Sequence, residues 1–277
     1  MASTDYVFTR DYLDNNRINL QHYLTVQLFG YHIHPSIPIT NKDLRIADVG
    51  TGTGIWLTDL STTLPKSARL DALDISFDAA PLPEMLPSNF SLHYWNIKED
   101  VPEHLIGVYD IVHIRFFAFV LRESEVKAAI DNLLKLLKPG GYLQWTDIDV
   151  SSIRLEILRP GIEIVAQTKL MELFQGNDDR MRSSWLPSLP KLFAEHGLVD
   201  VQFDEKEAPS HLALAFHECG MLAPEVLSRN KTTDEKTVQM LKETLDQAVK
   251  ETRAGSYLTF TRSTVVGRKN RENRDAE

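Results

Sequence analysis

The amino-acid sequence predicts an α/β fold: a doubly wound, seven-stranded sheet with a helical cap or lid. Two observations lead to this prediction. An apolar segment at residues 46–49 runs directly into a turn with three glycines, and helix-compatible sequence follows that turn. Strand-like and helix-like segments then alternate through the middle of the chain, which is the pattern of a largely parallel sheet covered on both faces.

Each element of the sheet follows from its own pattern. The expected strands are short apolar or alternating runs at residues 46–49, 70–75, 90–95, 109–114, 142–146, 201–203 and 257–266. The first helix follows the glycine turn and ends before Pro65. A second helix begins near Glu123 and stops at the Lys-Pro-Gly-Gly turn of residues 138–141, and a third is closed by Gly197.

Three segments fall outside this alternation and are mostly helical by pattern: residues 1–40, 151–190 and 207–255. We expect them to lie over the carboxyl ends of the strands, where ligands of such sheets bind. The chain, 1–277, is then a single domain. It has lid helices at 1–40, a ligand-binding core at 41–150, cap insertions at 151–190 and 207–255, last strands and their preceding helix at 191–206 and 256–267, and a disordered tail at 268–277.

Composition excludes several classes of function. The formal net charge of −9 argues against a surface that tracks phosphates, so no nucleic-acid partner is expected. Cys219 is the single cysteine, which excludes an internal disulfide framework and fits a reducing compartment. No apolar run reaches the length of a membrane span, and the first residues show no secretory pattern. We therefore expect a cytoplasmic protein without a membrane partner; its oligomeric state stays open.

The glycine turn carries the strongest functional signal. It reads Asp48-Val49-Gly50-Thr51-Gly52-Thr53-Gly54, with a G-x-G-x-G spacing where a dinucleotide fingerprint has G-x-G-x-x-G. Asp48 lies two residues before the first glycine, where a carboxylate would repel a pyrophosphate and attract an ammonium group. S-adenosylmethionine (SAM) has an ammonium and no phosphate, so it fits this arrangement better than NAD does.

Two further strand ends support a nucleoside ligand. Asp74 ends the second strand, where an acid is placed to accept both ribose hydroxyls. Asn96 follows the third strand and is placed to bond a base edge, or serves simply as a turn residue. Ile75 and Ile97 are the apolar neighbours expected to cover the nucleoside.

Together these residues resemble the class I SAM-dependent methyltransferases, which have a Rossmann-like fold. The resemblance is close over residues 44–150 and includes Leu136 to Leu143, the turn before the fifth strand. It implies that Asp48, Gly50, Gly52 and Gly54 wrap the amino-acid half of SAM, that Asp74 binds the ribose, and that S-adenosylhomocysteine (SAH) is the product. The wider sequence resembles fungal secondary-metabolite methyltransferases, including N-methyltransferases and regulators with the same core. This implies a small-molecule acceptor at N, O or S, with nitrogen slightly favoured.

Candidates for chemistry lie where the strand ends meet the cap. His113, near the end of the fourth strand, is the candidate general base or a packing residue. Arg115 is placed to hold the methionine carboxylate or an acidic substrate group, and Arg17 is a second candidate for that carboxylate. The expected acceptor pocket consists of Tyr12, His22, Phe116, Phe117 and Trp145, although aromatic residues at strand ends are more often core.

Absent patterns narrow the reaction. The place after the fourth strand reads His113-Ile114-Arg115-Phe116, without the acid that metal-dependent methyltransferases carry there, so no metal is expected. Three other functions remain open: a regulatory binding protein with a methyltransferase fold, a SAM-binding enzyme of pericyclase type, and NAD-dependent redox chemistry as the weakest.

Overall fold

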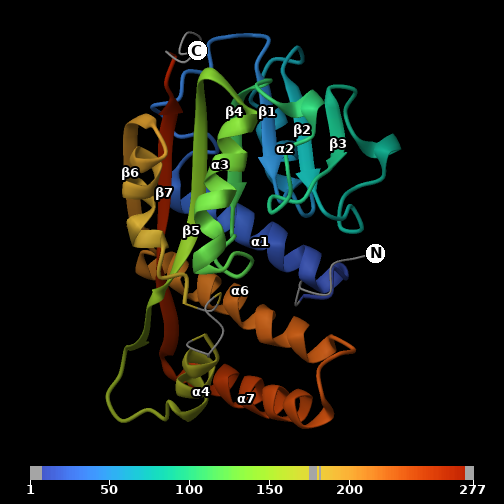
Figure 1. The fold of residues 1–277 in the computed structure, drawn as a ribbon. Coiled ribbons are helices and arrows are strands. Elements are labelled where there is room, and N and C mark those ends of the chain that lie inside the picture. The colour runs from blue at the N-terminus through green and yellow to red at the C-terminus, as the bar shows by residue number, and fades with distance from the viewer. Residues whose placement is uncertain (1–7, 175–179, 181, 272–277) are drawn as a thin grey trace.

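One mixed sheet of seven strands forms the centre of the molecule (Figure 1). The structure is a computed structural model and describes residues 8–174, 180 and 182–271. The order across the sheet is β3-β2-β1-β4-β5-β7-β6. Neighbours from β3 to β5 run parallel, and β7 runs antiparallel to both β5 and β6. The strands are β1 (Arg45–Val49), β2 (Arg69–Asp74), β3 (Phe90–Tyr94), β4 (Tyr109–Arg115), β5 (Leu137–Ile157), β6 (Leu198–Glu207) and β7 (Ser256–Lys269). The predicted α/β sheet is confirmed.

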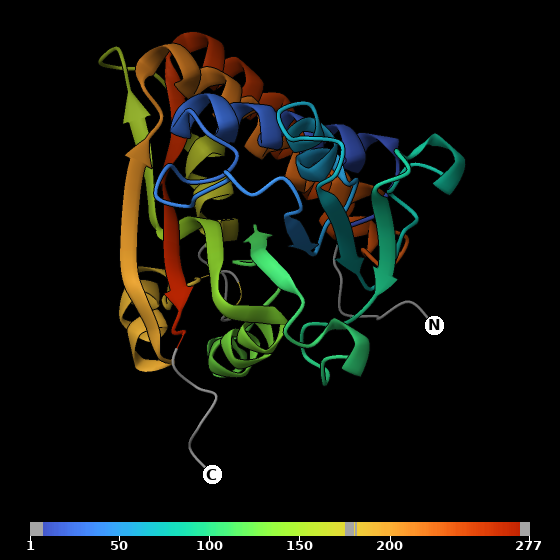
Figure 2. The ribbon, with the colours of Figure 1, turned by 90° about the horizontal axis from the view of Figure 1, so that it is seen from above.

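Helices cover the sheet on both faces (Figure 2). On one face lie α3 (Val126–Leu136) and α5 (Leu189–Glu195), packed on a core that includes Leu133, Trp145 and Phe193. On the other lies α2 (Ile55–Ser61), whose buried Trp56 and Leu60 pack on β1 and β2. The central strands are buried on both sides because helices cover both faces, which explains their continuous apolar runs.

Four further helices lie beyond the carboxyl ends of the strands. They are α1 (Tyr12–Phe29), α4 (Val165–Phe174), α6 (Ser210–Arg229) and α7 (Glu235–Ala254). Figure 1 shows α1 and α6 crossing below the ends of β1 and β2. The Asp11 side chain caps α1 by accepting from the amides of Leu13 and Asp14, and the helix packs on α6 through Leu24, Leu28 and Phe216. These helices cover the sheet edge at which ligands bind in α/β folds.

A long antiparallel pair carries α4 and α7 away from the rest of the sheet. β5 continues to Ile157 and pairs with β7 from Arg154↔Thr259 to Ile157↔Ser256, after an irregularity past Asp149. Residues 151–157 are therefore strand, where the sequence pattern predicted helix; pairing with β7 overrides the local preference. Glu251 of α7 accepts from the amides of Ala166 and Gln167, which anchors the amino end of α4.

The remaining elements are short. Single 3₁₀ turns lie at Pro83–Met85, Glu103–Leu105, Glu123–Glu125 and Leu186–Ser188. Residues 31–40 form turns between α1 and β1, where the pattern had predicted further lid helix. Most of the predicted tail, residues 272–277, lies outside the described residues. Among the described residues, no helix combines the length and the apolar character needed to cross a membrane.

Candidate functional site

A cavity of about 540 Å³ opens where the strands of the parallel half end. Its walls come from α1, from the segments that follow β1, β2, β3 and β4, and from α4, α6, α7 and β7. The segments after the parallel strands therefore supply one end of the cavity, and α4, α6, α7 and β7 supply the other.

The glycine turn after β1 forms the floor of the first end. Gly50, Gly52 and Gly54 all have left-handed φ angles, of 68°, 57° and 71°, which favour glycine. Gly50 donates its amide to the Leu73 carbonyl and Gly52 donates to the Asp74 carboxylate, both at 2.8 Å. These N–H groups are satisfied within the protein, so the turn suits a ligand without a phosphate better than one with a pyrophosphate.

Asp74 lies at the end of β2 beside this turn and lines the cavity. One carboxylate oxygen accepts from Gly52, and the other accepts from the amides of Ile75 and Ser76 at 2.7 and 3.2 Å. Burial raises the pKa of Asp74 above its ordinary value, although these amides oppose the shift. A carboxylate fixed in this way is placed to receive hydroxyl donors from a ribose.

Asp48 is bound from two sides at the end of β1. It accepts from Nδ1 of His113 at 2.7 Å and from the Thr51 hydroxyl at 2.8 Å. The His113 ring stacks on Trp56 with a centroid distance of 3.7 Å and an interplanar angle of 1°. His113 is 1% exposed, and burial lowers its pKa, so the ring is neutral and donates from Nδ1.

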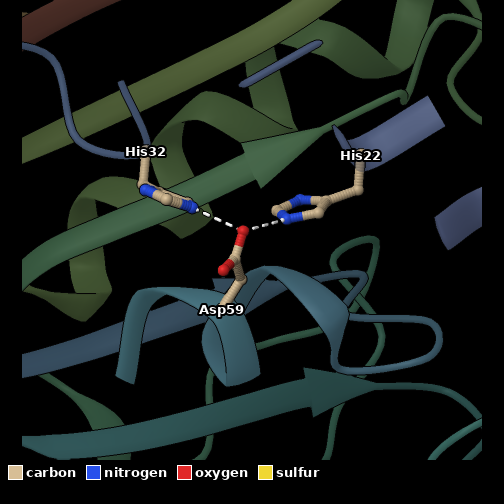
Figure 3. Close-up of side chains that lie close together, drawn as sticks. All are labelled: His22, His32 and Asp59. Carbon is tan, nitrogen blue, oxygen red and sulfur yellow. Dashed lines mark hydrogen bonds and ion pairs between the residues drawn. The ribbon is translucent and has the colours of Figure 1, made fainter. Parts of the chain in front are cut away.

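Arg115, at the end of β4, lines the cavity and binds a chain of polar groups behind it. Its Nη2 donates to Nδ1 of His22 at 3.0 Å. Because arginine has no acceptor, His22 must carry its proton on Nε2, which donates to Asp59 at 2.9 Å. His32 donates to the same Asp59 oxygen at 2.7 Å, so the carboxylate lies between the two rings (Figure 3).

His22, His32 and Asp59 have the ligand types of a metal site, and their ligand atoms lie within 4.8 Å of one another. A metal-bound histidine donates its second N–H to an acceptor. Here the second nitrogen of His22 faces the guanidinium of Arg115, which can only donate. The arrangement therefore suits a hydrogen-bonded chain that orients Arg115, and it disfavours a cation.

The loop after β4 closes over the glycine turn. Phe116 has a left-handed φ of 63°, and Phe117 turns its ring onto Gly50. Asp147, fully buried after the parallel part of β5, accepts from the amides of Phe117 and Ala118 at 2.7 and 3.1 Å. This buried carboxylate fixes a backbone conformation that Phe116 would not adopt in isolation.

Most of the predicted site residues line the cavity. They are Arg17, Asp48, Gly50, Gly52, Asp74, Ile75, Asn96, Ile97, Arg115, Phe116 and Phe117. Arg17 already has a carboxylate partner, since it binds Asp14 at 2.7 Å. Asn96 accepts from the amide of Lys98 and donates to Glu99, so its polar atoms have local partners.

Five predicted residues do not line the cavity. Tyr12 is 70% exposed at the start of α1, so its place in the acceptor pocket is corrected. The predicted place of Trp145 in the pocket is also corrected. Its side chain is fully buried in the core beneath α3 and α5, against Trp185. Gly54 is the N-cap residue of α2, immediately before its first residue. His22 and His113 lie behind Arg115 and Asp48, which counts against His113 as a base that meets the acceptor.

Sequence reasoning missed a second group of lining residues. Trp56, which also packs in the core, lines the cavity, and the far end contains residues from α4, α6 and β7: Phe174, Phe216, Phe260 and Arg262. A single arginine within the alternating run of β7 was the available signal for the last of these.

The residues present fit SAM. The glycine turn leaves room above Gly52, where an added Cβ would meet only Ile18 at 3.8 Å. Asp74 supplies acceptors for a ribose, and Asn96 and Ile97 line the cavity beyond it. Arg115 has no carboxylate within ion-pair distance in the part of the chain that the structure describes, so it is available to the amino-acid carboxylate.

Comparisons with known proteins agree with this site. The methyltransferase domain family matches residues 21–202. Methyltransferase grgD of Penicillium sp is 39% identical over 143 residues, 49% of this chain and 50% of that protein, so the matched part spans about half of this relative. N-methyltransferase gliN of Aspergillus fumigatus is 31% identical over 215 residues, 75% of this chain and 73% of that protein.

A solved structure shares the fold at low sequence identity. Phosphoethanolamine N-methyltransferase 2 of Haemonchus contortus, in complex with phosphomonomethylethanolamine and SAH, superposes with a TM-score of 0.53 at 12% identity. The superposition covers 97% of this chain and 59% of that one. The chain therefore belongs to the methyltransferase domain family.

Proposed function

We propose that the protein transfers the methyl group of SAM to a nitrogen atom of a small natural product. One observation carries this proposal: a single cavity runs from Asp74 and the glycine turn to a group of aromatic side chains from the loop after β4, α4, α6 and β7. These are Phe119, Phe174, Phe216 and Phe260. The first end suits a nucleoside donor, and the second suits a compact apolar acceptor.

Donor binding is assigned to the residues at the strand ends. Asp74 would accept from the ribose hydroxyls, and Asn96 and Ile97 would contact the adenine. Arg115, oriented by His22, would pair with the amino-acid carboxylate, in preference to Arg17, whose charge is already matched by Asp14. Asp48 would attract the ammonium group.

Bound SAM supplies a methyl group on a sulfonium, which is an excellent leaving group. The protein then has to hold the nucleophile in line and exclude water, and such positioning supplies roughly 7–11 kcal/mol of a barrier. Phe116 and Phe117 line the cavity beside the glycine turn and would exclude water there. A neutral amine attacks through its lone pair, so this assignment needs no base from His113.

Two further considerations support nitrogen and a small molecule. The relative gliN is an N-methyltransferase, and this chain matches 73% of its length. The aromatic end of the cavity is bounded by helices of the same chain, which fits a compact acceptor better than a macromolecule.

The first experiment is calorimetric titration of the purified protein with SAH, with NADH in parallel. We expect SAH alone to bind, and Asp74→Ala to weaken its binding at least 100-fold. The exposed Asp78 binds Ser76 and no other side chain of the described residues. It provides the control variant Asp78→Ala, for which SAH affinity should be unchanged.

The second experiment identifies the acceptor atom. The protein is incubated with methyl-labelled SAM and with matched aromatic amines, phenols and thiols, and products are located by mass spectrometry. Methylation of the amines supports the proposal, whereas label on oxygen or sulfur overturns the nitrogen assignment. SAH binding without methylation of any acceptor would favour the regulatory or non-methylating alternatives.

A further inference from the structure

Arg262 is a buried cation at the acceptor end of the cavity. It lies in β7 opposite Ile148 of β5, is 5% exposed and lines the cavity. The guanidinium lies over the Phe216 ring, with Cζ 3.7 Å from the ring centroid. Packing of this kind fixes the plane of the guanidinium and leaves its hydrogen-bond donors at the edge.

The donors of Arg262 are only partly used. Nη1 donates to the Phe260 carbonyl at 3.0 Å, whereas the buried Nε–H donates to no atom of the described residues. No carboxylate in that part of the chain lies within ion-pair distance of the guanidinium. A buried charge without a counter-ion is costly, and an anion that reached this edge would remove the cost.

Arg262 lies apart from Arg115, the residue that is assigned to the SAM carboxylate. Arg115 on β4 is aligned through Thr146 of β5 with Thr264 of β7, and Arg262 lies two residues beyond Thr264 along that strand. Two strand spacings also separate β4 from β7, roughly 10 Å across the sheet. The single carboxylate of SAM has Arg115 near the glycine turn, so the anion that meets Arg262 comes from another molecule.

We infer that Arg262 recognises a carboxylate of the acceptor substrate, whose apolar body lies among the neighbouring aromatic side chains. The inference rests on the proposed function and narrows it to acceptors that bear both a nucleophilic nitrogen and a carboxylate. A carboxylate takes two parallel N–H bonds from a guanidinium edge, which a neutral amide cannot do. Phe174 and Phe260 line the cavity beside this edge.

The test compares two probes of one shape, indole-3-acetate and indole-3-acetamide, by calorimetric titration into the SAH-loaded protein. We expect the carboxylate to bind at least tenfold more tightly than the amide to the unaltered protein. Arg262→Gln should remove this preference, and Arg262→Lys should retain part of it. SAH affinity should stay within twofold in both variants.

Arg253→Gln is the matched control, because it removes the same charge from an exposed residue of α7 that does not line the cavity. It should keep the preference for the carboxylate. Equal binding of the two probes by the unaltered protein overturns the inference without the need for any variant. So does a preference that survives in Arg262→Gln.

The test of Arg262 and the test of methyl transfer can fail independently of each other. If SAH binds and amines are methylated while the two probes bind equally, methyl transfer stands and the role of Arg262 is wrong. If no acceptor is methylated but the carboxylate preference depends on Arg262, the anion site stands and the transferase assignment fails.

Discussion

The ring of Phe117 lies against the backbone of Gly50, so closely that a Cβ on Gly50 would be 2.4 Å from its Cε2 atom. This contact joins the glycine turn after β1 to the loop after β4, and Asp147 fixes that loop through the Phe117 amide. The two segments that would border the methyl donor are therefore placed relative to each other by packing as well as by the sheet.

Gly50→Ala should disrupt this contact. The new methyl group would displace the Phe117 ring, and the φ of 68° would be strained for alanine. We expect SAH affinity to fall at least tenfold in calorimetric titration. Gly107→Ala is a matched control, since Gly107 has a φ of 67° and no atom within 4 Å of an added Cβ. It should cost about 1 kcal/mol of stability and leave SAH affinity unchanged. An equal loss of SAH affinity in both variants would mean that backbone strain alone, and not the contact with Phe117, is responsible.

His113→Ala should affect folding and donor binding together. The substitution leaves the buried Asp48 carboxylate without its ring partner and removes the stack on Trp56. We expect the free energy of unfolding to fall by about 3 kcal/mol, measured by chemical denaturation, and SAH affinity to fall as well. Normal stability and SAH affinity with lost turnover would instead identify His113 as a base.

The stability of the protein should fall in mild acid through His22. Burial, followed by the charge of Arg115, lowers the pKa of His22 from 6.5 to about 4. The unfolded chain therefore takes up a proton at a higher pH than the folded one, so the free energy of unfolding decreases as pH falls through this window. His22 alone should contribute about 2 kcal/mol between pH 7 and pH 5.

The measurement is the free energy of unfolding at both pH values. Burial also lowers the pKa of His217 to about 4, so His217 should add a similar pH dependence to the free energy of unfolding. A variant is therefore needed to isolate the contribution of His22. His22→Gln should have a shallower dependence than the parent, and His211→Gln, at an exposed position, should match the parent. Equal slopes for the parent and His22→Gln would contradict the assignment.

Removal of divalent metal should leave SAH binding and methyl transfer unchanged. The reason is the protonated Nε2 of His22, which faces Asp59 instead of offering a lone pair. Dialysis against EDTA, followed by elemental analysis and calorimetric titration, tests this expectation. One equivalent of retained zinc or iron that is lost in His32→Ala would show that the cluster in Figure 3 is a metal site.

Local sequence was sufficient for the donor end of the site. Asp48, Gly52, Asp74 and Asn96 lie at or just after the ends of β1, β2 and β3. Parallel strands bring their carboxyl ends to one edge, so strand assignment alone placed these residues together. The sequence was less informative about which face of the sheet each strand residue points to. Trp145 lies in β5 near the cavity, but its side chain points to the opposite face of the sheet and packs in the core against Trp185.

The acceptor end depends on pairings that no local pattern contains. Residues 151–157 became strand because β7, about a hundred residues later, lies beside them. Arg262 reaches the cavity through the same pairing. The role of His22 was also beyond local reasoning, because its partners Asp59 and Arg115 come from α2 and β4.

The long β5–β7 pair has an evolutionary consequence. The family match ends at residue 202, so α6, α7 and β7, which carry Phe216 and Arg262, fall outside it. The matched stretch thus contains Asp48, Asp74 and Arg115 of the proposed donor end, whereas part of the proposed acceptor end lies beyond it. Proteins that resemble this chain over residues 21–202 can share a reaction and still act on different metabolites. A comparison of the residue at position 262 among them would group them by acceptor substrate.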